Sequence, residues 1–201
     1  MVAFVRESVV TPENQAAYRA RSAEFAAVRA QQPGFQGALQ LDAGAGRSLQ
    51  LILWESLAAQ LAAQPVVQPT LDRVHALWAT PGLLLGTGEV LRNTITTGTA
   101  SGFARLGEST YALDRLATGQ AQVDEFWAIR AALPGFLGTI EVDAGAGRYL
   151  SLSLWASAAQ QQAATPTLAP AVERLLAPLF AAPQRVLGLG AVVYDSLTTR
   201  A

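Results

Sequence analysis

The stretch that decides the fold is Asp42-Ala43-Gly44-Ala45-Gly46-Arg47, because it returns unchanged 101 positions later as Asp143-Ala144-Gly145-Ala146-Gly147-Arg148. The similarity extends in both directions at the same offset. Pro33-Gly34-Phe35 returns as Pro134-Gly135-Phe136, and Leu53-Trp54 returns as Leu154-Trp155. Self-similarity over about a hundred residues predicts two copies of one structural unit in a single chain.

The pattern of one copy predicts the order β-α-β-β-α-β, which is the ferredoxin-like arrangement. Ala43-Gly44-Ala45-Gly46 is typical of a hairpin turn, and Thr11-Pro12-Glu13 of a helix start. Pro65 and Pro69 are expected to interrupt the second helical region. The expected strands span 2–10, 35–42, 47–55 and 83–97, and the expected helices span 12–31, 56–63 and 70–79.

Each copy needs a partner for its sheet. Two helices cover one face of such a sheet, and the other face, apolar at Leu49, Leu51 and Leu53, must be buried elsewhere. We therefore expect an α+β protein in which two ferredoxin-like repeats pack sheet to sheet as an intrachain dimeric α+β barrel. The expected repeats span 1–97 and 103–201, with a short polar linker at 98–102.

Composition excludes several kinds of chemistry. The 201 residues contain no Cys and no Lys, and His75 is the one histidine, so thiolate, Schiff-base and His-rich metal chemistry are excluded within one chain. A net charge of −1 argues against nucleic acid and anionic membrane surfaces as partners. We find no signal peptide and no apolar run of about 18 residues, so the expected location is the cytoplasm.

The Pro-Gly-Phe motif, the hairpin and the strand that ends Leu-Trp-x-Ser before an Ala-rich helix resemble the antibiotic-biosynthesis-monooxygenase type of dimeric α+β barrel. That resemblance implies a small-molecule ligand and, in some members, oxygenation without a cofactor. Many members carry a His where this chain has Ala63 and Ala164. The haem-degrading branch uses an Asn in the first strand, where this chain has Glu7 and Ser8. The resemblance therefore implies the fold without a complete catalytic set.

The candidate catalytic residues are His75, Glu7 and Glu108. His75 lies on the same helical side as Trp78 and is interpreted as a general base or haem ligand, or alternatively as a packed or rim residue. A buried Glu7 or Glu108 would act as a base, and the alternative is an ion pair with Arg47 or Arg148.

The candidate substrate-binding residues lie on the strand face opposite the leucines, which we expect to look into the barrel or its mouth. Rings with nearby hydroxyls and amides suit a flat aromatic ligand, and the alternative is packing between the two sheets. This set, with the tryptophan that follows His75, is Gln50, Trp54, Trp78, Tyr149, Ser151, Ser153 and Trp155.

Three functions fit these residues. The first is a cofactor-independent monooxygenase-like protein that binds a small aromatic or enolisable molecule in the barrel. The second is a non-catalytic small-molecule-binding or stress-response barrel. The third is haem binding through His75. The two halves differ at several of these positions, so any two sites would differ, and the sequence leaves open whether whole chains form a further homodimer.

Overall fold

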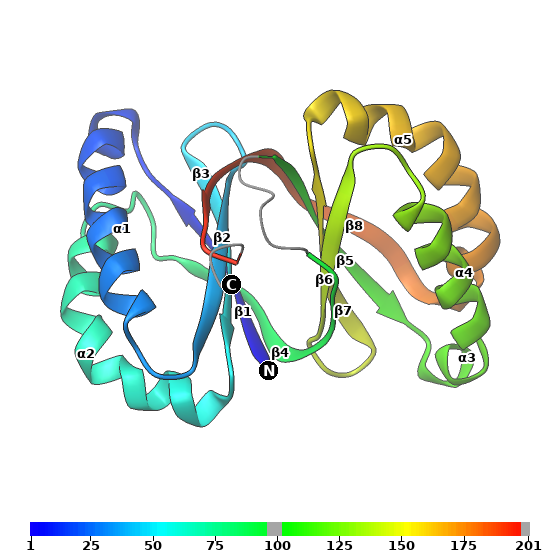
Figure 1. Cartoon of the computed structure of the whole chain (residues 1–201), viewed down its shortest axis with the longest axis horizontal. Coiled ribbons are helices and arrows are strands. Elements are labelled where there is room, and N and C mark those ends of the chain that lie inside the picture. The colour runs from blue at the N-terminus through cyan, green and yellow to red at the C-terminus, as the bar shows by residue number, and fades with distance from the viewer. Residues whose placement is uncertain (96–101, 198–201) are drawn as a thin grey trace.

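The computed structural model describes residues 1–95 and 102–197. Each half of the chain places its helices on the outside and its strands towards the other half (Figure 1). The first half consists of β1 Val2–Val9, α1 Gln15–Ala30, β2 Phe35–Asp42, β3 Arg47–Trp54, α2 Leu57–His75 and β4 Leu83–Asn93. The second half consists of β5 Phe103–Tyr111, α3 Leu113–Thr118, α4 Gln120–Ala131, β6 Phe136–Asp143, β7 Arg148–Trp155, α5 Ala158–Ala171 and β8 Phe180–Asp195. Apart from Gly102, the predicted linker lies outside the described residues.

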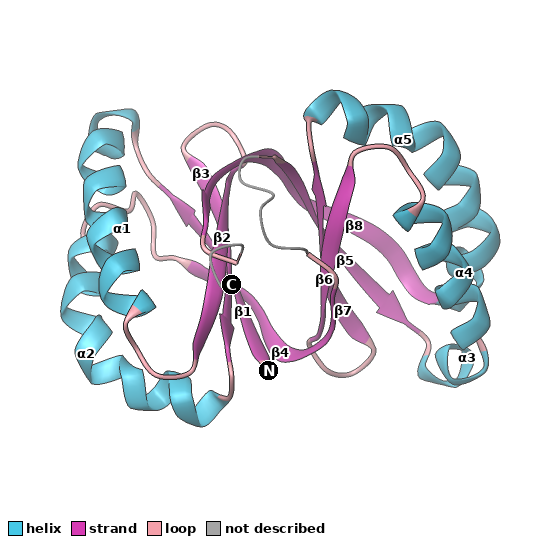
Figure 2. Cartoon of the chain, viewed as in Figure 1, coloured by secondary structure: helices cyan, strands magenta, loops and turns pink. Residues whose placement is uncertain are grey.

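The eight strands form one closed barrel in the order β1-β3-β2-β8-β5-β7-β6-β4. The last strand of each half joins the halves: β4 pairs with β1 and with β6, while β8 pairs with β5 and with β2. Figure 2 shows the strands in the middle of the molecule with the helices on the two outer sides. The predicted intrachain α+β barrel is therefore confirmed.

The barrel interior is a continuous apolar core. Leu49, Leu51 and Leu53 from the first half are at most 1% exposed and pack with Leu106, Leu150 and similar residues from the second half. The leucine face is therefore the face that the other half covers, as expected. Burial of this many aliphatic side chains is the main force that holds the halves together.

The opposite strand face lies under the helices, so the prediction that it looks into the barrel was wrong. Trp54 packs with Phe35 and Ala63, and Gln50 lies near Tyr18 of α1. Alternation along a strand separates two faces, but both faces of this sheet are buried, and the more uniformly apolar one fills the barrel. A ligand site on the Gln50 face is therefore outside the barrel core.

Helices α2 and α5 are each continuous through two prolines, contrary to the break predicted at Pro65 and Pro69. Pro65 and Pro69 lie inside α2, and Pro166 and Pro170 occupy the matching positions in α5. Each proline removes the backbone donor that would pair with the carbonyl four residues earlier, which is that of Leu61 for Pro65 and that of Pro65 for Pro69. Packing of the buried face of α2 against α1 outweighs the local cost. None of the helices in the described residues is long and apolar enough to cross a bilayer.

Glycines allow the two halves to approach closely where β4 and β8 cross over. A Cβ on Gly88 would lie 1.7 Å from the Asp143 carbonyl oxygen, and one on Gly190 would lie 1.7 Å from that of Asp42. The pairing register shifts beside Gly86 in β4 and beside Gly188 in β8, so each of these strands contains a bulge. Only glycine fits at the closest of these contacts.

Candidate functional site

A space that is partly open to solvent lies between α1, α2 and the outer face of the first-half sheet, and we call it the first cavity. Its volume is about 710 Å³. Arg29, Tyr18 and Gln40 contribute polar groups to its wall, while Phe25, Ile52 and Val74 make it apolar elsewhere. A largely apolar pocket with a few polar groups that face one another is typical of a small-molecule site.

Arg29 is the most deeply buried charge in this cavity. It is 5% exposed, and its guanidinium carbon lies 4.7 Å from the centre of the Phe25 ring and 5.1 Å from that of Phe35. Burial lowers the pKa of Arg29 to about 10. Its Nε and Nη1 have no hydrogen-bond partner among the described residues. A buried guanidinium whose Nε and Nη1 have no hydrogen-bond partner among the described residues favours an anionic ligand.

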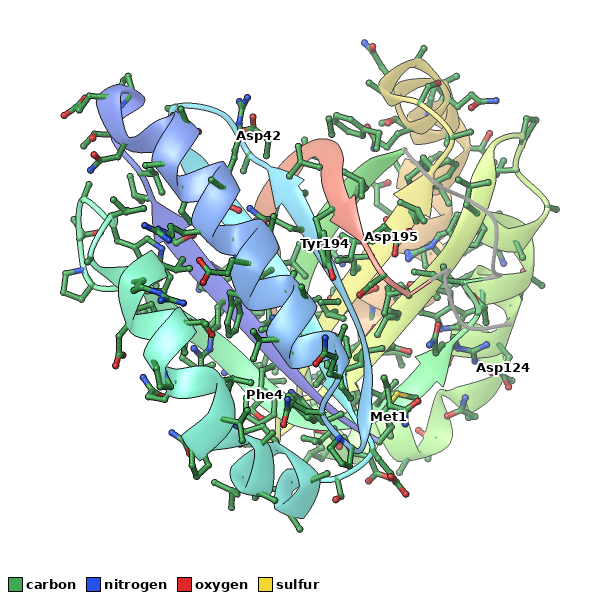
Figure 3. All side chains as sticks on the ribbon, turned by 60° about the vertical axis from the view of Figure 1, so that its left-hand side comes forward. Met1, Phe4, Asp42, Asp124, Tyr194 and Asp195 are labelled. Atoms are coloured by element: carbon green, nitrogen blue, oxygen red, sulfur yellow. The ribbon has the colours of Figure 1, made fainter. Side chains whose placement is uncertain are left out.

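The other half of the chain completes the first cavity. Tyr194 of β8 is opposite Gln40 of β2 in the strand pairing and interacts with Arg29. Figure 3 shows Tyr194 near the end of β8, at the level of α1. The cavity therefore exists as described only when the barrel is closed.

A hydrogen-bond network lines the cavity floor. The amides of Gln40 and Gln50 donate to the Tyr18 hydroxyl at 3.3 and 3.2 Å, and Gln40 also donates to Ser48 at 2.7 Å. The Tyr18 hydroxyl also lies 3.4 Å from the Ser8 hydroxyl. These contacts fix the side chains in place, so a ligand would meet a pre-organised polar surface.

His75 does not face the first cavity. It borders a shallower depression of about 630 Å³, and only Arg6 and Trp78 border both spaces. Its ring lies 4.1 Å from the Trp78 ring, and its Nε2 is buried without a hydrogen-bond partner among the described residues. Burial, and then the charge of Arg6, lower the pKa of His75. Haem ligation by His75 stays a prediction, and it would require the buried Nε2 to become accessible.

Glu7 and Glu108 form ion pairs with Arg47 and Arg148, which was the alternative interpretation of these two glutamates. Glu7 lies 3.1 Å from Arg47, and Glu108 lies 2.8 Å from Arg148 and 3.1 Å from Arg185. Neither glutamate borders the cavities described here. Their geometry supports a structural role at the junction of the halves.

The second half has its own space between helices and sheet, which we call the second cavity. Its volume is about 360 Å³, roughly half that of the first. Arg130 occupies the position that matches Arg29; it is 6% exposed, and burial lowers its pKa to about 10. Glu141 occupies the position that matches Gln40, and burial raises its pKa against the opposing effects of Arg130 and Arg92.

The predicted binding residues are thus divided between separate sites. Gln50 and Trp78 border the first cavity. Trp54 is buried beside it, with its ring 5.3 Å from Phe35. The four predicted residues of the second half border the second cavity: Tyr149, Ser151, Ser153 and Trp155.

Sequence reasoning missed the buried arginines and their neighbours. Arg29 and Arg130 are matched at the repeat offset, and that recurrence was the available signal. Arg73–Glu24 and Arg174–Glu125, at 2.5 and 2.8 Å, also recur, but these are exposed ion pairs between helices. The described residues hold no group of three or more His, Cys, Asp or Glu side chains able to bind a metal ion.

Comparisons with known proteins support the fold. No family model and no curated protein sequence matches the chain. Among solved structures, a "putative monooxygenase" from Fusobacterium nucleatum has a TM-score of 0.74 at 7% identity, covering 96% of this chain and 93% of that one. A "putative monooxygenase" from Lactobacillus acidophilus has a TM-score of 0.72 at 8% identity, covering 98% and 96%. An anthrone oxidase-like protein has a TM-score of 0.68 at 14% identity, covering 99% and 94%. The chain therefore has the fold of the antibiotic-biosynthesis-monooxygenase type of dimeric α+β barrel, with both halves in one polypeptide.

Proposed function

We propose that the first cavity binds the enolate or phenolate form of a small flat aromatic molecule and promotes its oxidation by O2 without a cofactor. The observation that supports this most directly is the unsatisfied guanidinium of Arg29 in the cavity wall. A desolvated positive charge lowers the pKa of an acidic C–H or O–H group placed beside it, because it stabilises the anion that forms.

Arg6 strengthens this preference. It borders the same cavity, it is half-buried, and its Nε has no hydrogen-bond partner among the described residues. Burial lowers the pKa of Arg6, which reflects an environment poor in water. Two guanidiniums and the Tyr18 hydroxyl can therefore hold the oxygen of an enolate, while Phe25 and Ile52 contact the ring.

The chemistry needs little else from the protein. An enolate is electron-rich and can reduce O2 directly, so the protein has to bind it, orient it and exclude water. For a substrate such as anthrone, whose methylene is conjugated with a carbonyl through the aromatic rings, one oxygen atom of O2 becomes a new carbonyl on the methylene carbon. The other oxygen leaves as water with the two methylene hydrogens. Among the solved structures with a similar fold, two bear the name "putative monooxygenase" and one the name "anthrone oxidase-like protein". Those names agree with this reaction class.

Anthrone oxidation tests the proposal. We expect the protein to accelerate oxygen consumption and anthraquinone formation above the spontaneous rate. Substitution Arg29→Met should lower the rate by about a hundredfold, the usual effect of removing one donor to a developing oxyanion. Arg130→Met removes the matching charge from the other half and serves as the control, with a much smaller effect expected. Absence of any acceleration by the wild-type protein would end the oxygenase proposal.

Binding without turnover is the second candidate, and one observation favours it. The one carboxylate among the described residues that border the first cavity is Asp42, whose Oδ1 accepts a hydrogen bond from the Gly44 backbone at 2.9 Å. No histidine borders this cavity. Proton removal would then depend on water or on the substrate's own acidity. Anthrone binding that depends on Arg29, without oxygen consumption, would support this second function.

A further inference from the structure

The two cavities differ in charge although the repeat places them at matching positions. Four arginines and one aspartate border the first cavity: Arg6, Arg19, Arg29, Arg47 and Asp42. Two arginines and two glutamates border the second: Arg105, Arg130, Glu141 and Glu173. Arg19 is exposed and the charge of Arg47 is paired with Glu7, so the excess of positive charge inside the first cavity comes from Arg6 and Arg29. In the second cavity, Glu141 offsets part of the charge of Arg105 and Arg130. Since charge inside a poorly solvated space strongly affects ligand selection, the two should not accept the same molecules.

The difference is concentrated at one pair of matching positions. Gln40 is opposite Tyr194 across the junction of the halves, and Glu141 is opposite Arg92 across the matching junction. Gln40 is neutral and uses its amide to hold Tyr18 and Ser48. Glu141 instead brings an acidic group into the second cavity, where the position that matches Tyr18 is Gly119.

Unsatisfied polar groups line the second cavity. The Ser151 hydroxyl and the Arg130 Nε are buried without a hydrogen-bond partner among the described residues. Ser151 is opposite Glu141 in the pairing of β6 with β7. Among the described residues no arginine nitrogen forms an ion pair with Glu141, so this carboxylate acts on Arg130 and Arg92 at longer range. Acceptors and donors are therefore available together in one small space.

Aromatic rings form the rest of the wall. Trp127, Trp155 and Phe126 border the second cavity, and the Arg130 guanidinium carbon lies 4.3 Å from the centre of the Trp127 ring. Such walls suit a flat apolar body with one polar edge. An edge that has a carbonyl next to an N–H or O–H would satisfy Arg130 and Glu141 at once.

We propose that the second cavity is a separate binding site for a small uncharged aromatic molecule with a donor and an acceptor on one edge, and that Glu141 excludes the anions that the first cavity accepts. The claim that the two cavities select different ligands rests on the proposed function, the anion site in the first cavity. The claim that the second cavity binds an uncharged aromatic molecule depends on the second cavity alone, and binding measurements test it without turnover.

Two probes of the same shape separate the charge effect from size. 2-Naphthoate is an anion at neutral pH, and 2-naphthamide is its uncharged analogue with an N–H donor and a carbonyl acceptor. By titration calorimetry, we expect the wild-type protein to bind one equivalent of naphthoate. The Glu141→Gln variant should bind a second equivalent, with an affinity gain of at least about tenfold at that site, a usual effect of removing a repulsive charge. Gln40→Glu should weaken naphthoate binding at the first cavity by a similar factor.

Glu173→Gln is the matched control for Glu141→Gln. It removes the same charge from the exposed rim of the second cavity, where solvent screens it, so no second naphthoate equivalent should appear. Naphthamide reports on the site directly. Ser151→Phe should fill the cavity and abolish the naphthamide binding located there, while the naphthoate equivalent of the first cavity is retained. If Ser151→Phe does not fold, Glu141→Leu removes the acceptor and should weaken naphthamide about tenfold.

Any of three results would overturn the inference. The first is a wild-type protein that already binds two equivalents of naphthoate, and the second is a Glu141→Gln variant that gains none. The third is naphthamide binding that neither second-cavity variant alters. Failure of the first-cavity proposal would look different: naphthoate would not bind the wild-type protein in a manner sensitive to Gln40→Glu, while the naphthamide experiment would still decide the second cavity.

Discussion

The guanidinium of Arg47, in the first half, donates a hydrogen bond to the backbone carbonyl of Leu187, in the second half. Arg148 makes the mirror contact with the carbonyl of Leu85. Both leucines are the unpaired residues of the bulges in β8 and β4, so the bulge leaves the carbonyl free for the arginine. The motif that is identical in both copies therefore ends in the residue that joins the halves.

Loss of this junction should reduce stability measurably. Arg47→Ala removes the ion pair with Glu7 and leaves the Leu187 carbonyl without its donor. Hydrogen bonds with a charged partner contribute about 1.5–3 kcal/mol, so we expect a loss of about 2 kcal/mol in the free energy of unfolding. Urea denaturation measures it. Arg21→Ala removes an exposed ion pair with Glu24 on one helix, where a loss of about 0.5 kcal/mol or less is expected, and is the control. Equal losses in the two variants would contradict a special role for the junction.

Closure of the barrel should be very sensitive to Gly88. A methyl group there would lie 1.7 Å from the Asp143 carbonyl, and backbone atoms cannot give way as a flexible side chain does. We expect Gly88→Ala to lower the free energy of unfolding by about 3 kcal/mol, the upper part of the range for overpacking. In Gly107→Ala the nearest atom is the Arg105 guanidinium at 3.1 Å, which can move, so thermal unfolding should change much less. If the Gly88→Ala protein were as stable as the Gly107→Ala protein, β4 and β6 could move apart with little loss in the free energy of unfolding.

The repeat predicted the fold because it identified the elements twice, and β2 was predicted with its observed bounds, Phe35–Asp42. The pattern correctly predicted that the other half covers the leucine face of β3, but it also placed Trp54 in the barrel or its mouth. Trp54 and Leu53 are both buried, so burial on the Trp54 face did not by itself indicate packing under the helices. The burial of Arg29 and Arg130 was not predicted for a related reason, because an arginine on a helix normally indicates a solvated face. The cavities arise where that rule fails, and local patterns do not reveal tertiary burial.

A site that holds a buried carboxylate should cost stability, and Glu141 allows a test. Burial raises the pKa of Glu141 in the folded protein, although Arg130 and Arg92 oppose the shift and Arg105 borders the same cavity. The unfolded chain therefore loses this proton at lower pH than the folded one. The stabilising contribution of the protonated form is present below the ordinary pKa of glutamate and is lost as pH rises through the folded pKa. Glu141→Gln should therefore raise the unfolding free energy at pH 7 relative to wild type, with the difference shrinking towards pH 4. A variant less stable than wild type at pH 7 would show that its partners stabilise the carboxylate more than burial destabilises it.

His75 should change the free energy of unfolding with pH in the opposite direction to Glu141, and in a different pH range. Burial, and then Arg6, lower its pKa, while Asp72 opposes them, so the folded protein binds this proton less readily than the unfolded chain. The stability contributed by neutral His75 is present above the ordinary pKa of histidine and is lost as pH falls through the lowered folded pKa. His75→Leu introduces the residue found at the matching position, Leu176, and removes this titration. We expect the unfolding free energy of the variant to fall less than that of wild type between pH 7.5 and pH 5, as measured by urea denaturation at each pH. Carboxylates titrate in both proteins, so the difference between the two curves isolates the histidine. Parallel curves would mean that Trp78 and its neighbours leave His75 as free to protonate as in the unfolded chain.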